Sequence, residues 1–270
     1  MPEVWSCKNI DSEALIKTIK ENPEIIKGVK VRATSSFVRN VGVEGIRRAK
    51  GVAVSAGLPL MVHLGIEPGE DIPDSEISDF TKKLLSLLNQ GDILSHIYTW
   101  KKGGIINSDG AILPEAKEAL QRGVLLDVAN AKTHFSFDIA KIGLEQEFVP
   151  HTISTDLTNI NINDSVYSLP VTMSKLLAAG LSLEQVIKMT TISPAIALRE
   201  DCRRGSLRVG FSADISIFEL KEGEFQFADG ILGRSFQGKF LLIPWLTIKS
   251  GIEVTAKPRF FEKRSEFPWA

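Results

Sequence analysis

Short apolar runs alternate with longer amphipathic segments along the first 150 or so residues. In the longer segments apolar residues recur near i, i+3, i+4 and i+7, the period of one helix face. These segments predict helices at 41–57, 74–90, 114–123 and 137–148. The short runs are apolar or rich in β-branched residues and predict strands at 28–32, 59–64, 92–97, 124–128 and 151–156. Such alternation indicates βα units around a parallel sheet, an α/β fold.

The pattern changes after residue 156. Helical periodicity predicts two helices at 170–180 and 182–191, followed by a short helical turn in the run SPAIAL. Residues 206–220 and 238–254 then read as strands of a small β segment, and the last residues mix charges with aromatics without a period. We therefore expect an α/β domain at 1–203, a β segment at 204–254 and an irregular tail at 255–270.

The composition is that of an ordinary globular protein. Of 270 residues, 43% are hydrophobic and 24% charged, and the formal net charge is -1, which excludes collagen-like and disordered chains. Near-neutral charge favours neither a nucleic-acid nor a membrane partner. The beginning of the chain does not resemble a signal peptide, no apolar run reaches 18 residues, and two cysteines suit a reducing compartment. We expect a cytoplasmic protein.

An ionisable residue ends, or nearly ends, each expected strand. These residues recur at intervals of 29 to 33 positions and are Lys30, His63, His96, Asp127 and Asp156. A period near 33 is also typical of ankyrin and TPR repeats, but those motifs are missing and each interval contains a strand. Because barrel enzymes place their active sites at the C-terminal ends of parallel strands, we expect these side chains to converge on one such edge.

The residue types indicate a metal site rather than a core. Unpaired ionisable groups are costly to bury, whereas imidazole and carboxylate are good ligands for zinc and similar divalent ions. A lysine can join them when CO2 converts its amine to a carbamate. Asp156 would then accept the proton of a water whose pKa the metal lowers.

Several motifs in a fixed order extend this interpretation to most of the chain. They are Gly28-Val29-Lys30-Val31-Arg32, Met61-Val62-His63, His96 followed by Gly103-Gly104, Ser154-Thr155-Asp156, and Gly205-Ser206-Leu207 with Gly210 and Ala213-Asp214. To about Val254 the chain resembles the amidohydrolase superfamily, and within it the dihydroorotase-related deacetylase branch. The resemblance implies a partial (β/α)8 TIM barrel, strands four to eight, with a C-terminal β-sandwich segment.

The same resemblance implies a reaction and its residues. Lys30 would be the N6-carboxylated lysine that bridges two metals, His63 and His96 the ligands of the second metal, and Asp156 a ligand and the general base. One or two divalent ions, zinc being the expected metal, would activate hydroxide to hydrolyse a C–N amide or ester bond of a small molecule. N-acyl deacetylation and cyclic amide hydrolysis are the expected reactions.

The chain departs from the family pattern in two places. The family's first strand carries an HxH pair, but the four histidines here are His63, His96, His134 and His151, and a Gly-His-Gly after strand seven is replaced by Ala129-Asn130-Ala131. Strands one to three are therefore expected to be missing, with exposed strand edges covered by a homo-oligomer or by an N-terminal segment. The alternative function is a catalytically impaired or inactive remnant with at most one metal site.

Each candidate also has a structural interpretation. Lys30 could extend to solvent at a strand end, His63 and His96 could be ordinary strand-end histidines, and Asp156 could cap a helix. Asp127 is assigned an orienting or structural role. His134 and His151 are assigned no role in the site. Arg32, on the same strand face as Lys30, and Asn107, in the loop after His96, are the candidates for binding substrate.

Overall fold

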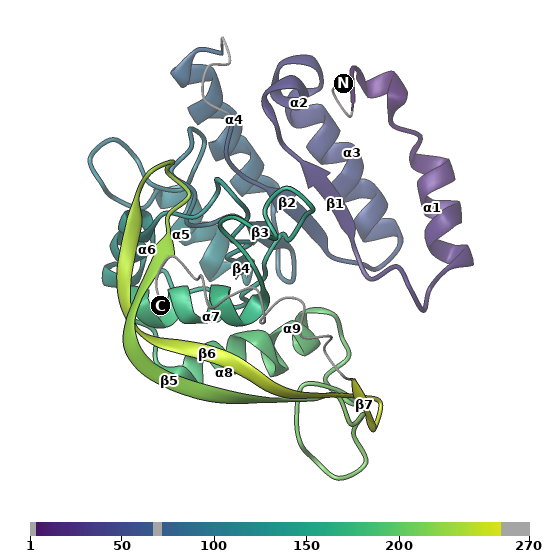
Figure 1. The fold of residues 1–270 in the computed structure, drawn as a ribbon. Helices are drawn as coiled ribbons and strands as arrows, with labels where there is room; N and C mark the ends of the chain where they lie inside the picture. The colour runs from purple at the N-terminus through teal and green to yellow at the C-terminus, as the bar shows by residue number, and fades with distance from the viewer. Residues whose placement is uncertain (1–3, 67–71, 255–270) are drawn as a thin grey trace. The chain divides into compact units, whose positions relative to one another are not determined.

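The computed structural model describes residues 4–66 and 72–254 (Figure 1). The chain divides into two compact units. The first unit contains residues 1–129 and 142–150, and the second contains residues 130–141 and 151–270. The predicted irregular tail at 255–270 lies outside the described residues.

A parallel sheet forms the centre of the first unit, with its strands in sequence order (Figure 1). Its strands are β1 (Val29–Arg32), β2 (Leu60–His63), β3 (Ile93–Ser95) and β4 (Leu125–Asp127). The helices between and after them are α3 (Gly42–Ser55), α4 (Asp74–Leu87), α5 (Pro114–Gln121) and α6 (Phe137–Glu145). Four of the five predicted strands and all four predicted helices of this region are confirmed.

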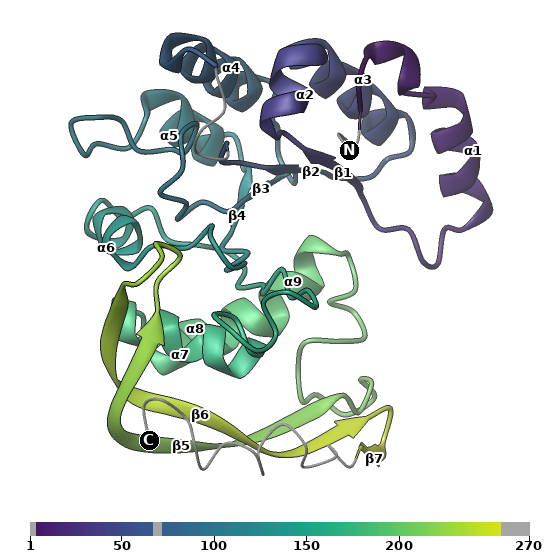
Figure 2. The ribbon, with the colours of Figure 1, turned by 45° about the horizontal axis from the view of Figure 1, so that its top comes forward.

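Side chains alternate between the two faces of this sheet. The register aligns Val31, Val62, Leu94 and Leu126 in one apolar row, and three of them are fully buried. The next row, on the opposite face, is Arg32, His63, Ser95 and Asp127. Helix α3 packs on β1 and β2, and α4 packs on α3, so helices cover one face (Figure 2). The polar row lies at the C-terminal ends of the strands.

Two helices in the first unit were not predicted from the sequence pattern. They are α1 (Ser12–Glu21) and α2 (Ser35–Asn40), preceded by a 3-10 turn, η1 (Cys7–Asn9). Asp11 caps α1 by accepting a hydrogen bond from the Ala14 amide at 2.9 Å. Its apolar residues Leu15, Ile16 and Ile19 have helical spacing, although only Ile19 is buried.

The predicted fifth strand at 151–156 is wrong: the structure assigns no strand there. The amides of Asn130 and Ala131 donate to the carbonyls of Ser154 and Thr155 at 3.0 and 2.9 Å. Consecutive residues of a strand point their carbonyls in opposite directions, so consecutive acceptors on one side are not a ladder. Accordingly, four strands and not five form the sheet, and the described residues do not close a barrel.

The second unit combines three helices with an antiparallel sheet in the order β5-β6-β7. The elements are α7 (Leu169–Ala179), α8 (Leu183–Thr190), α9 (Ile192–Ala197), β5 (Ile215–Ala228), β6 (Ser235–Lys249) and β7 (Ile252–Val254). The helices are confirmed, but β5 starts nine residues later than predicted. Turns at Gly205 and Gly210, with φ of 80° and 91°, occupy the earlier residues. The described part of the predicted sandwich segment is a single sheet.

Strands β5 and β6 form a long bent ribbon that passes along α7 (Figure 2). Gly238 permits this contact, because a Cβ there would lie 2.8 Å from the Ala178 Cβ and 2.7 Å from the Phe227 ring. The Ser174 hydroxyl of α7 accepts a hydrogen bond from the Leu242 amide of β6 at 2.9 Å. Among the described residues, no helix is both long and apolar enough to span a membrane.

Candidate functional site

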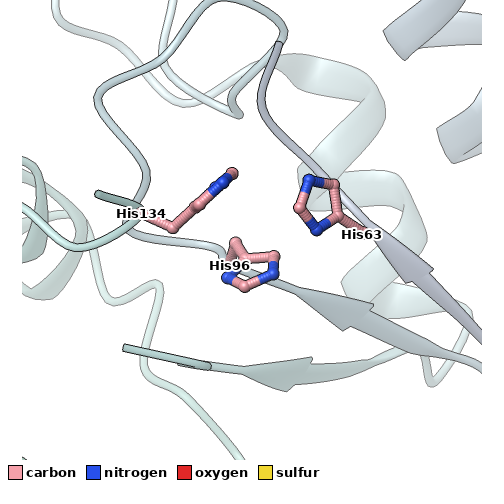
Figure 3. Close-up of side chains that lie close together, drawn as sticks. All are labelled: His63, His96 and His134. Carbon is pink, nitrogen blue, oxygen red and sulfur yellow. The ribbon is translucent and has the colours of Figure 1, made fainter. Parts of the chain in front are cut away.

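Two buried imidazoles lie together at the C-terminal edge of the parallel sheet. His63 is the last residue of β2 and His96 directly follows β3. Their ring centroids are 4.4 Å apart and the rings meet edge to face at 77° (Figure 3). The two side chains are 4% and 1% exposed. The predicted convergence of His63 and His96 is therefore confirmed.

The backbone at His96 departs from a regular strand. Its φ is 66°, in the left-handed region, which costs a residue with a Cβ roughly 1–2 kcal/mol. The next amide, that of Ile97, donates to the Asp127 carbonyl of the neighbouring strand at 3.3 Å. The surrounding structure thus holds His96 in a costly conformation, which is characteristic of functional positions.

A backbone contact fixes the tautomer of the His96 ring. His96 Nδ1 lies 2.7 Å from the Ala129 carbonyl oxygen, and because a carbonyl only accepts, Nδ1 carries the proton. His63 makes a hydrogen bond to the Gly65 backbone that favours its protonated form. Each ring is thus left with one unprotonated nitrogen, the arrangement in which histidine binds metal ions.

Both rings stay neutral at physiological pH. Burial lowers the pKa of His63 to about 3, helped by the nearby charges of His96, Lys30 and Arg32. Burial also lowers the pKa of His96 to about 3, and Lys30, Lys101 and Arg32 act in the same direction against the bond to Ala129. Neutral imidazoles are the ligand form, so no proton has to leave before a metal binds.

The cations of β1 occupy different rows of the sheet. Arg32 pairs in register with His63, whereas Lys30 pairs with Met61, two positions further from the strand end. The expectation that Lys30, His63 and His96 occupy equivalent positions is therefore wrong. Because Lys30 and Arg32 are two residues apart, both nevertheless project from the same face. Both are exposed, and their charges reach the two imidazoles.

Two further polar residues of the first unit have defined contacts. Asp127, 2% exposed, accepts a hydrogen bond from the Ser95 hydroxyl at 3.3 Å. Asn107 is half-buried, and its side-chain oxygen accepts from the amides of Asp109 and Ala111 at 3.0 and 2.9 Å. The Asn107 oxygen thus builds its own turn, which leaves the NH2 end for another partner.

Asp156 belongs to the second unit and is exposed. Its φ is 48°, and its carbonyl accepts a hydrogen bond from the Asn161 side chain at 3.0 Å. The alternative that Asp156 caps a helix is wrong, because residues 157–168 form turns and irregular backbone. The left-handed conformation therefore needs a reason other than helix capping.

The other two histidines also belong to the second unit. His134, also drawn in Figure 3, is 6% exposed and precedes α6, as expected for a loop-to-helix junction. His151 is half-buried, and burial lowers its pKa. The sequence interpretation missed Asn130 and Lys175, two buried polar residues of this unit. A lysine within a helix as apolar as α7 was the signal available.

Known proteins resemble the chain in sequence and in fold. The model of the amidohydrolase family matches residues 1–255. A deacetylase of Agrobacterium fabrum, Atu3266, is 30% identical over 268 residues, 97% of this chain and 61% of the relative. The crystal structure of a dihydroorotase superposes with a TM-score of 0.82 at 30% identity, covering 94% of this chain and 63% of that one.

An adenine deaminase structure is similar as well, with a TM-score of 0.81 and 27% identity, covering 92% of this chain and 65% of that one. The chain thus spans less than two thirds of the length of each of these three proteins. The three names describe different reactions.

Proposed function

The chain belongs to the amidohydrolase family, and from this premise we propose that it is a metal-dependent hydrolase of C–N amide or ester bonds in small molecules. N-acyl deacetylation and cyclic amide hydrolysis are the reactions we favour. The deacetylase and dihydroorotase relatives, each 30% identical to the chain, support this choice.

The imidazole pair is the observation that carries the proposal. His63 and His96 are buried and neutral, and a neutral imidazole has one unprotonated nitrogen. This donor set suits zinc or a similar divalent ion. A bound ion would supply Lewis acidity, which lowers the pKa of water and polarises a carbonyl oxygen.

The charge of Lys30 supports its carboxylation. As an ammonium group, Lys30 disfavours positive charge on both imidazoles, and it would disfavour a divalent cation for the same reason. A carbamate on Nζ replaces this positive charge with a negative one and offers two oxygen ligands. We therefore propose Lys30, His63, His96 and Asp156 as the metal-binding residues, for one or two ions.

The remaining residues would act on the proton and the substrate. Asp156 accepts the proton of the attacking water and passes it to the leaving nitrogen, as a general base and then an acid. Arg32, in register with His63, binds an anionic group of the substrate, and the NH2 group of Asn107 donates to it. We infer a small, acylated or cyclic amide substrate with a negative charge.

A chelation experiment tests this function. The purified chain is assayed on a panel of N-acetylated amino acids and cyclic amides, before and after removal of metal, and again after addition of zinc. We expect amide hydrolysis that chelation abolishes and zinc restores, and an unchanged rate for His151→Ala, a matched histidine control. A metal-loaded chain without activity on the whole panel would favour the inactive remnant.

A further inference from the structure

A lysine ammonium group is buried inside the second unit. Lys175 lies in the middle of α7, where it is 2% exposed. Burying an unpaired charge costs several kcal/mol in proteins, so a lysine at such a position requires polar partners. This burial lowers the pKa of Lys175 to about 7.

The acceptors of the Lys175 ammonium are neutral oxygens. Nζ donates to the Ser165 carbonyl at 2.7 Å and to Asn130 Oδ1 at 3.4 Å, and it lies 5.8 Å from the centroid of the Phe135 ring.

The acids near Lys175 have other partners. Asp229 accepts from the amides of Phe137 and Ile231, at 2.9 and 2.8 Å, and Asp164 pairs with Lys132. Their charges act on Lys175 from a distance, raising its pKa against the larger effect of burial. The two hydrogen bonds of Lys175 are therefore to the backbone carbonyl of Ser165 and to the Asn130 side chain.

These two contacts meet the ends of the segment that carries Asp156. We name residues 154–168 the Asp156 loop. At its start, the Ser154 carbonyl accepts from the Asn130 amide at 3.0 Å. Near its end, the Ser165 carbonyl accepts from Lys175. Asn130 is fully buried and also donates from its side chain to Thr172 of α7 at 3.4 Å. One ammonium thus links both ends of the loop.

The loop needs such support because its backbone is strained. Within it Asp156 and Tyr167 are both left-handed, with φ of 48° and 57°, and each such residue costs roughly 1–3 kcal/mol. Inside the loop the Asn161 side chain holds both the Asp156 carbonyl and the Thr158 amide, at 3.0 and 2.7 Å. Strained conformations persist only where the surroundings determine them.

We propose that Lys175 is a positioning residue that sets the conformation of the Asp156 loop, and through it the direction of the Asp156 carboxylate. The role of this carboxylate as general base rests on the proposed function. Lys175 itself touches neither substrate nor metal in this scheme. An orienting group of this kind can change rates strongly, since a displacement of about 1 Å can cost about 100-fold.

Lys175→Met tests the proposal, because it preserves the apolar stem and removes the ammonium. We expect amide hydrogen exchange to accelerate within residues 154–168, while α8 and the first unit stay protected. On an N-acetylated amino acid that the wild type hydrolyses, kcat should fall between about 10- and 100-fold with KM nearly unchanged. Lys188→Met, at an exposed lysine of α8, is the matched control and should change neither readout.

Other results would overturn the proposal. Exchange that accelerates evenly over the second unit, with kcat per folded molecule unchanged, would make Lys175 a stability residue only. Lys175→Gln keeps a hydrogen-bond donor without the charge, so hydrogen exchange in the same loop should accelerate less than in Lys175→Met. This variant replaces Lys175→Met in the test if the Met variant does not fold. If Asp156→Asn keeps wild-type activity, the general base assignment fails, but the exchange readout still decides whether Lys175 holds the loop.

Discussion

The imidazole pair and the Asp156 loop place polar side chains by different means. His63 ends a regular parallel strand and His96 follows one, so the register of the sheet fixes their backbones. Asp156 lies on irregular backbone, and side chains hold that backbone through Asn161, Asn130 and Lys175. The comparison teaches that ladder hydrogen bonds can position a ligand even where the backbone is left-handed, as at His96, whereas a carboxylate on irregular backbone requires its own network of buried polar groups.

Removing a ligand should have the largest effect. His96→Ala is expected to lower amide hydrolysis by more than about 100-fold, because even residues that only orient a metal ligand cost 10- to 100-fold. His151→Ala is the control, and steady-state rates on the same N-acetylated substrate are the measurement. Equal rates for the two variants would remove the imidazole pair from the mechanism.

The next largest effect should come from Asp156. Asp156→Asn keeps the size of the side chain but cannot accept a proton, so we expect kcat to fall about 100-fold. Because Asp156 is exposed, the thermal unfolding of the variant should match that of the wild type. A matched variant is Asp201→Asn, at an exposed acid of the same unit that has no assigned role. A comparable loss of kcat in both variants would contradict the role of Asp156 as the general base.

Crowding the contact of α7 with β6 should weaken the second unit. Gly238→Ala places a Cβ within 2.8 Å of Ala178 and 2.7 Å of the Phe227 ring, so something must shift. We expect a loss of about 1–3 kcal/mol in the free energy of unfolding, measured by urea denaturation. Stability within about 0.5 kcal/mol of wild type would show that β6 is not tightly packed there.

Lys175 should make stability depend on pH. Its pKa is lowered from 10.5 to about 7 in the folded protein, so between these values the unfolded chain binds more protons and stability rises with pH. Relative to Lys175→Met, the wild type should gain about 1.4 kcal/mol per pH unit above pH 7. Urea denaturation of both proteins at three pH values measures the slope. Parallel pH profiles would mean that Lys175 is solvated.

A small stabilisation is expected in the first unit. Gly51 lies inside α3 with nothing near its missing Cβ, so Gly51→Ala should add about 0.5–1 kcal/mol through helix propensity. Urea denaturation measures the change, and the same substitution should raise the free energy of unfolding at Gly51 and lower it at Gly238. A destabilised Gly51→Ala would show that the outer face of α3 is covered.

The sequence allowed the sheet to be predicted because its strands carry their signal locally. Apolar runs before His63 and His96, separated by amphipathic helices, were enough to place both imidazoles at one edge. The register of the strands was not predictable from the sequence, because an ionisable residue at the end of an apolar run does not reveal which residue of the next strand it pairs with. Lys30 was therefore expected to lie level with His63, but it pairs with Met61. Sheet register depends on long-range contacts.

The Asp156 loop was not predictable for a related reason. The run 151–156 has the alternation of a strand, but its hydrogen bonds go to Asn130, Ala131 and Met189 in an order that no strand ladder has. Likewise, a single lysine in an apolar helix does not reveal that its partners lie 10 and 45 residues away. Positions held by distant side chains leave no periodic pattern in the sequence.

The metal content of the purified chain tests the central claim most directly. Elemental analysis of the wild type, His63→Ala, His96→Ala and His151→Ala measures bound zinc and other divalent ions per chain. We predict one or two ions in the wild type and in His151→Ala, and loss of at least one ion in each of the other two variants. A wild type that binds no ion, or pair variants that retain the full complement, would contradict the account.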